Sequence, residues 1–224
     1  MAQRYFDEEL DYLKSKLLRM AGLTEEQIDR ALDALVTRDS ALARDVIKRD
    51  HQVDVMDVEI DEDCIRLLAL HQPAARDLRL VTTAMKLASE LERISDLAES
   101  VCKRAIELNE EPQLKPYIDI PRMGKWARMM VKESIDAFVK NDATLARKVL
   151  MDDAVVNDLM VQVFRELLSF MLEDPQTTTR AIRLIFIAKT LERIGDHATN
   201  IAELVVYLVE GKIIRHVAPT EPPK

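Results

Sequence analysis

The second half of this chain repeats the first, and this internal repeat constrains the fold more than any other feature of the sequence. Segment Leu91–Asp96 (LERISD) matches segment Leu191–Asp196 (LERIGD) after a shift of 100 residues. A shift of 103 residues aligns further pairs nearer the N-terminus, namely Arg19-Met20 with Arg122-Met123, Asp33-Ala34 with Asp136-Ala137, Asp39 with Asp142, Leu42-Ala43-Arg44 with Leu145-Ala146-Arg147, and Asp50 with Asp153. The two halves are therefore expected to fold alike.

Long stretches without proline indicate long helices. The 224 residues include only four Gly, and aromatic residues make up 4% of them. The eight prolines fall at the joints between the stretches, at Pro73, Pro112, Pro116, Pro121, Pro175, Pro219, Pro222 and Pro223. Because an interior proline breaks a helix, the intervals between these joints are free to be helical.

Apolar residues recur at spacings of three and four on both sides of Pro73, which is typical of buried helical faces. One run extends from Leu42 to Leu67 and predicts a single helix that ends near His71. A second run, from Val81 to Ala105, predicts a helix that starts near Ala75. Residues between these helices then form a tight antiparallel turn.

Each half is expected to contain such a hairpin and one leading helix. The leading helices are predicted over about residues 5–37 and 117–140. The sequence thus predicts an all-α fold of two tandem three-helix bundles related by the repeat. The first bundle is expected over residues 1–112 and the second over 113–214, with a flexible tail at 215–224.

The charge and cysteine content narrow the class of protein. The net charge is −8, and no stripe of Lys or Arg could neutralise several phosphates in a row, so nucleic-acid binding is not expected. No stretch has the apolar character of a signal peptide or a membrane span. Cys64 and Cys102 lie among apolar residues without a CxxC pattern, which favours core thiols in a reducing cytoplasm.

Acidic side chains gather on one face of each predicted hairpin. Glu92 and Asp96 are four residues apart, as are Glu192 and Asp196, and like charges at this spacing repel. The preceding helix of the first half carries a further stripe of acids at spacings of four, three and four, namely Asp50, Asp54, Asp57 and Asp61.

A hairpin that turns near residue 73 places these acids opposite one another, because facing positions have numbers that sum to about 146. Asp54 then faces Glu92, and Asp50 faces Asp96. In the second half the same rule sets Asp153 and Asn157 against Asp196 and Glu192, with Asn200 one turn beyond. Packed helices lie about 8–10 Å apart, a gap that paired carboxylates close on a cation rather than on each other.

Ligands that are all oxygen favour hard or borderline cations such as Mg, Mn, Ca or Fe, and exclude a structural zinc finger. The second site is expected to be weaker, because Met160 and Phe164 replace Asp57 and Asp61. The candidate ligands are Asp50, Asp54, Asp57, Asp61, Glu92, Asp96, Asp153, Asn157, Glu192, Asp196 and Asn200.

Neighbouring polar residues fit the metal site less well. His197 follows Asp196 directly, which turns it about 100° away from the acids. Arg93 and Arg193 are expected to screen the acids, and Glu59 and Asp63 to be solvated.

Two other readings of the acids stay open. One is a carboxylate-bridged metalloenzyme on a helical bundle, but such di-iron sites add a Glu-x-x-His sequence, and Ser95 and Gly195 stand where its histidines would be. The other is a metal-free helical scaffold, which acid-to-amide changes would stabilise by relieving repulsion. We expect a binding protein rather than an enzyme.

Four phrases of the sequence, HQPAARDLRL, ELERISDLAE, EDPQTTTRAIRL and KTLERIGDHATNIAE, resemble the two half signatures of the PhoU family. The resemblance implies two three-helix bundles that hold multinuclear iron or zinc clusters, with Mn or Mg as further candidates. It maps onto Glu92/Asp96 and Glu192/Asp196, and the sequence departs from a full acid pair at Asn157.

The resemblance also implies a function. Family members are cytoplasmic negative regulators that couple the phosphate ABC transporter, through its ATPase PstB, to the sensor kinase PhoR. They restrain phosphate uptake and the starvation response when phosphate is plentiful. We therefore expect a homodimeric regulator that reaches the membrane only through its partners.

Overall fold

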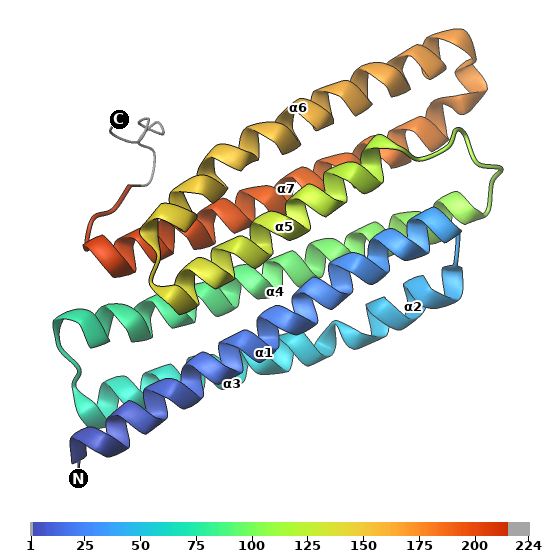
Figure 1. Ribbon diagram of the computed structural model, residues 1–224. Coiled ribbons are helices and arrows are strands. Elements are labelled where there is room, and N and C mark those ends of the chain that lie inside the picture. Colours follow the sequence, from blue (N-terminus) through green and yellow to red (C-terminus); the bar gives the residue numbers. More distant parts are fainter. Residues whose placement is uncertain (1, 215–224) are drawn as a thin grey trace, which may run out of the picture.

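The computed structural model describes residues 2–214, and every regular element in this range is helical (Figure 1). The helices are α1 (Ala2–Thr37), α2 (Ser40–Arg49), α3 (His51–His71), α4 (Ala75–Asn109), α5 (Asp119–Lys140), α6 (Ala143–Glu173) and α7 (Thr178–Glu210), with a 3-10 turn η1 (Pro175–Thr177) before α7. The predicted all-α class is confirmed. The predicted tail, 215–224, lies outside the described residues.

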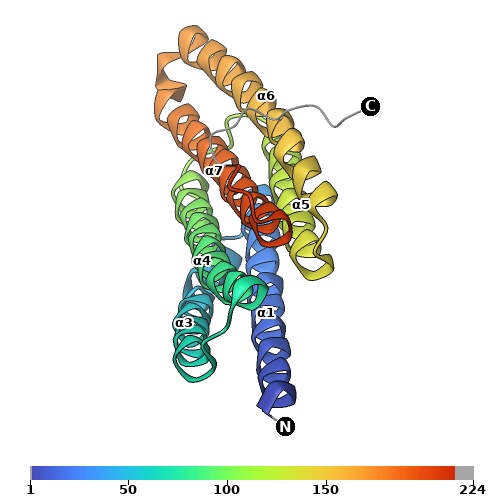
Figure 2. The same ribbon diagram turned by 90° about the vertical axis from the view of Figure 1, so that its left-hand side faces the viewer.

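The helices form two bundles that pack along their length. Helices α1 to α4 make the first bundle and α5 to α7 the second, and the bundles meet where α4 lies against α7 and α1 against α5 (Figures 1 and 2). One hydrophobic core runs through both bundles. Both copies of the LERI motif therefore lie on inner helices, and the boundary predicted at residue 112 falls in the connection between α4 and α5.

The repeat extends to the turn after each leading helix. Arg38 and Asn141 occupy equivalent positions and both adopt the left-handed conformation, with φ of 56° and 51°. The next residues, Asp39 and Asp142, accept hydrogen bonds from backbone N–H groups of the helix that follows. The aligned aspartates are thus N-caps, which satisfy helix-terminal donors that would otherwise lack partners.

The helix predicted from Leu42 to His71 is broken at Asp50, so the prediction of one continuous helix is wrong at this point. The Asp50 carbonyl oxygen accepts a bond of 2.8 Å from Val53 N and a longer one of 3.4 Å from Asp54 N. The tighter three-residue bond interrupts the regular ladder between α2 and α3. In the second half, α6 runs unbroken through the equivalent residue, Asp153.

The contact between α1 and α5 includes a close approach at a glycine. A Cβ added at Gly124 would lie 2.4 Å from a methyl carbon of Leu32, far inside van der Waals contact. Gly124 corresponds to Ala21 of the first half, so the smallest residue stands where the leading helices of the two bundles meet. Arg128 of α5 adds an ion pair with Asp29 of α1, with 2.9 Å between Nε and Oδ1.

Cys64 and Cys102 are fully buried and unpaired, as predicted for core thiols, and burial raises the pKa of each to about 12.

Among the helices of residues 2–214, none combines the length and the apolar character needed to span a membrane.

Candidate metal centre

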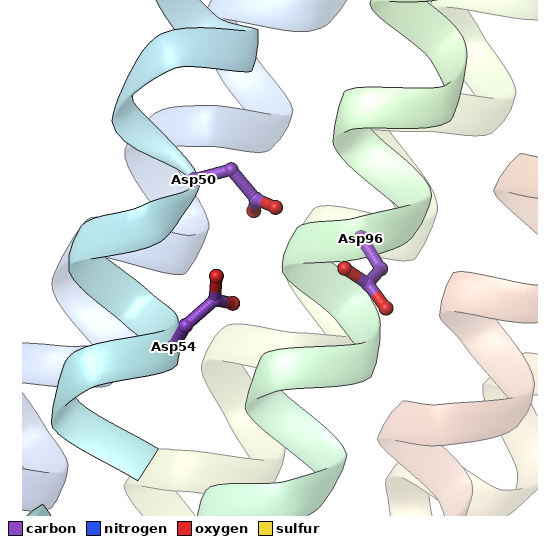
Figure 3. A group of neighbouring side chains, drawn as sticks. All are labelled: Asp50, Asp54 and Asp96. Atoms are coloured by element: carbon purple, nitrogen blue, oxygen red, sulfur yellow. The ribbon is translucent and has the colours of Figure 1, made fainter. Parts of the chain in front are cut away.

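Three aspartates from two helical segments converge in the first bundle (Figure 3). Asp50 and Asp54, at the start of α3, project toward α4, which carries Asp96, and one carboxylate oxygen of each lies within 4.8 Å of the others. Three negative charges at this separation repel one another strongly, and more so away from bulk water. The arrangement therefore calls for either bound protons or a bound cation.

Asp50 occupies a position that the helical pattern assigns to the core. Val46 and Val53 of the same stripe are fully buried, and Asp50 between them is only 8% exposed. A buried carboxylate needs a polar partner. The hydroxyl of Ser95 on α4 donates a hydrogen bond to Asp50 Oδ1 and also contacts the side-chain amide of Gln27 on α1.

Asp50, Asp96 and Glu92 have raised pKa values, as expected when negative charges are buried close together. Burial raises the pKa of Asp50, and the charges of Asp54 and Asp96 raise it further. Burial also raises the pKa of Asp96, with the charge of Asp54 adding to the shift. The pKa of Glu92 is raised by burial and then by the charge of Asp96, while Arg93 acts in the opposite direction.

Two further acids extend the cluster along α3. Burial raises the pKa of Asp57, as do the charges of Asp61 and Asp54. Within residues 2–214 no group donates a hydrogen bond to Asp57 Oδ1, although this oxygen is buried. A buried carboxylate oxygen without a donor suits a metal ligand, because a cation can satisfy it.

The acids of the first site lack ion pairs with lysine or arginine side chains of residues 2–214, although Arg93 and Lys103 lie close enough to lower the pKa of Asp96. The six acids are Asp50, Asp54, Asp57, Asp61, Glu92 and Asp96. A histidine ring nitrogen, Nδ1 of His51, approaches Asp54 only to 3.9 Å. The residues present thus fit a multivalent cation held by oxygen ligands.

The second bundle has acids at equivalent positions, but part of their negative charge is neutralised. Asn157, in place of Asp54, donates a 2.7 Å hydrogen bond to Asp153 Oδ2, and Lys189 forms an ion pair with Glu192. Burial raises the pKa of Asp153, and also that of Asp196, where the charge of Glu192 adds to the effect. This site carries fewer acids than the first.

The residues that support the buried aspartate also differ between the halves. Gly195 and Met130 stand at the positions of Ser95 and Gln27, so both polar partners are lost. A Cβ added at Gly195 would lie 3.4 Å from Asp153 Oδ1 and 3.7 Å from the Met130 thioether. Among the described residues Asp153 Oδ1 has no hydrogen-bond partner, although it is buried.

Asn200 and His197 lie at the contact between the bundles. The Asn200 amide donates a 3.1 Å hydrogen bond to Glu90 Oε2 of α4, and His197 Nδ1 is 2.6 Å from the same oxygen. The prediction that His197 turns away from the acids agrees with this contact. Asn200 as a ligand stays a prediction, since the structure shows its amide group bound to Glu90.

Sequence reasoning missed the supporting residues Ser95 and Gln27. The Ser/Gly difference between the two motif copies marked Ser95, whereas nothing in the pattern of α1 marked Gln27. Glu99, one turn beyond Asp96, also contributes a negative charge that raises the pKa of Asp96, and its spacing could have revealed it.

One sequence expectation about the neighbouring acids needs correction. Asp63 is largely buried and pairs with Lys16 of α1 at 2.7 Å, whereas Glu59 is exposed as expected and pairs with the same lysine at 3.1 Å. The facing rule agrees with the structure at Asp50 and Asp96, which lie together with Asp54, and the charges of Asp54 and Asp57 also act on Glu92.

The same duplication appears in comparison with known proteins. The PhoU domain model matches residues 17–105 and again residues 120–205. This chain belongs to the PhoU family. The two matches contain the two LERI motifs and all eleven candidate ligands.

Relatives within the PhoU family cover nearly the whole chain. A phosphate-specific transport system accessory protein PhoU homolog from Pseudomonas aeruginosa is 44% identical over 96% of this chain and 89% of its own length. The accessory protein PhoU of Escherichia coli is 35% identical over 96% of this chain and 90% of its own. These names describe accessory proteins rather than enzymes.

Solved PhoU structures share the fold. The crystal structure of PhoU from Pseudomonas aeruginosa superposes with a TM-score of 0.89 at 45% identity, covering 92% of this chain and all of that one (100%). The phosphate transport system regulatory protein PhoU from Streptococcus pneumoniae gives a TM-score of 0.87 at 30% identity, covering 93% of this chain and 98% of its own.

Proposed function

We propose that this protein is a cytoplasmic, metal-binding negative regulator of phosphate uptake and of the phosphate-starvation response. Its membership of the PhoU family makes it an accessory protein of phosphate transport and not an enzyme. The finer proposal is that it acts by contact between the transporter ATPase PstB and the sensor kinase PhoR. It would reach the membrane only through these partners and act as a homodimer.

The observation that carries the metal proposal is the cluster of acids without paired cations in the first bundle. Asp50, Asp54 and Asp96 would hold the first ion, and Asp57 with Glu92 would extend the site to a second. Iron or zinc, with Mn or Mg as alternatives, would supply positive charge that offsets the repulsion and ties α3 to α4. The role assigned to the metal is structural.

The second bundle would hold a reduced site. Asp153, Asn157, Glu192 and Asp196 remain its proposed ligands, with Asn200 at its edge. Because Lys189 already neutralises Glu192, the net attraction for a cation is smaller than in the first bundle. We propose weaker binding or fewer ions there.

Metal analysis of the purified protein tests the metal proposal. The wild type is expected to retain Fe, Zn, Mn or Mg after gel filtration and to melt at a higher temperature with metal than without it. The Glu92→Ala/Asp96→Ala variant should retain less metal, because only the weaker second site is left intact, and its melting temperature should depend less on metal. Glu62→Gln, which changes an exposed acid of α3, should change neither property. Equal metal content in all three proteins would refute the proposal.

Gene deletion tests the regulatory proposal independently. Phosphate-responsive genes should become constitutively active in phosphate-rich medium when the protein is absent, and the wild-type gene should restore repression. Normal repression in the deletion strain would refute the regulatory role and leave the metal result standing.

A further inference from the structure

A groove of about 490 Å³ opens between α1 and α3 on the outside of the first bundle. Tyr12, Arg19 and Leu23 line it from α1, and Val55, Met56 and Glu59 line it from α3. The acids of α3 lie at positions 50, 54, 57 and 61, which the helical repeat places on the opposite face from 52, 55 and 59. The groove is therefore separate from the metal centre.

The walls of the groove combine exposed apolar side chains with polar ones such as Ser15, Gln52 and His51. Tyr12 is 58% exposed and Val55 is 42% exposed. Exposed aromatic and apolar side chains in a concave surface are typical of sites that bury a partner's side chains. Leu23 and Met56, which are more buried, form the floor.

One wall is held in place before any partner arrives. The Lys16 ammonium lies 5.4 Å from the centre of the Tyr12 ring and pairs with Glu59 and Asp63 of α3. These contacts bridge α1 and α3 and restrict the aromatic side chain. A restricted side chain loses less conformational entropy when it binds.

Arg19 supplies a positive charge that nothing in the structure neutralises. It is exposed, and none of the ion pairs within residues 2–214 involves it. In a protein of net charge −8, such an arginine at the edge of an apolar groove favours a carboxylate from outside. The apolar surface of Leu23, Val55 and Met56 favours a partner with apolar side chains, because a small hydrated anion gains nothing from contact with it.

The second bundle keeps an apolar residue at one groove position and loses it at another. Trp126 stands at the position of Leu23, and both side chains are half-buried against the core. Lys115 stands at the position of Tyr12 and is buried in an ion pair with Glu166. The arginine recurs unchanged, as exposed Arg122.

We propose that the α1/α3 groove docks an amphipathic helix of a partner protein, with apolar side chains on Leu23 and Val55 and a carboxylate on Arg19. A groove between two antiparallel helices accepts a third helix along its length, as in other helix-in-groove complexes. This proposal rests on the proposed function, which supplies the two partners to be tested. They are the transporter ATPase and the cytoplasmic part of the sensor kinase.

Calorimetric titration of the full-length protein with each of these two purified partners tests the groove. Arg19→Glu should weaken binding of at least one partner about tenfold or more, since it places a carboxylate against a carboxylate. Arg122→Glu makes the same charge change at the equivalent position of the second bundle and should leave binding within about twofold. Val55→Arg, which blocks the groove, should weaken binding as Arg19→Glu does.

All variants must keep the helix content and melting temperature of the wild type, which their exposed positions favour. If the wild type binds a partner and Arg19→Glu and Val55→Arg bind it equally well, the groove proposal is overturned and the proposed function survives. If the wild type binds neither partner, both the groove proposal and the proposed partners are overturned.

Discussion

The two bundles share a backbone plan but differ in the charges they place on it. Both use a left-handed residue and an aspartate cap after the leading helix, and both place an aspartate at the same point of the hairpin, buried as Asp50 and half-buried as Asp153. In the first bundle that aspartate is supported by Ser95 and surrounded by acids, whereas in the second Asn157 and Lys189 offset the charge. The comparison shows that the helix ends and caps are repeated in both halves, whereas the side chains that face the acids differ between them.

The largest expected effect comes from making the first site resemble the second. Asp54→Asn removes a charge from the aspartate cluster and introduces the amide found at Asn157. Affinity for Mn²⁺ in the first site should fall about 100-fold, because a ligand and part of the balancing charge are lost together. Titration calorimetry measures the change.

The reverse substitution is the matched control. Asn157→Asp should strengthen binding at the second site, although Lys189 limits the gain. If Asp54→Asn and Asn157→Asp leave both affinities unchanged, the charge difference between the halves has no bearing on metal binding.

The contact between the leading helices offers the next effect. Gly124→Leu should lower the free energy of unfolding by about 1–3 kcal/mol, because the new side chain overlaps Leu32. Gly22→Ala changes a helical glycine of α1 with open space around it and should raise stability by about 0.5–1 kcal/mol. Urea denaturation compares the two, and a stabilised Gly124→Leu variant would show that the bundles do not need this close approach.

A smaller effect tests the Ser/Gly difference between the motif copies. Gly195→Ser places a hydroxyl near Asp153 Oδ1 and should raise stability by about 1 kcal/mol through helix propensity and a new hydrogen bond. Gly195→Ala provides the propensity without the hydroxyl. Only the serine should lower the pKa of Asp153, which NMR titration can follow, and identical pKa values in the two variants would contradict the expected bond.

The smallest effect is the pH dependence of the metal-free protein. Burial and neighbouring charges raise the pKa values of Asp50 and Asp96 in the folded state, so the folded protein binds more protons than the unfolded chain between the ordinary and the raised values. Stability from these groups should therefore increase as the pH falls through their raised pKa values toward the ordinary aspartate value of about 4. Thermal melting in chelator should show this slope, and Asp50→Asn should flatten it more than Asp153→Asn does.

Periodicity and the repeat were sufficient to predict the helices and the position of the acids, because both depend on local spacing. The break at Asp50 was missed because the apolar stripe continues across it without a change of phase. Gln27 was missed because it reaches Asp50 only through Ser95 from another helix, a relation that no spacing records. The pairing of Lys16 with Asp63 was missed for the same reason.

The packing of α4 against α7 limits how freely the two halves of a duplicated protein can evolve. These two helices touch neighbours on several sides, and Glu90 ties one to the other through His197 and Asn200. A substitution on either helix therefore disturbs both copies of the ancestral unit at once. Within the described chain, the outer helices, α3 and α6, each pack only against their own bundle. Mutation can therefore give one of them a new role while the other keeps the original one.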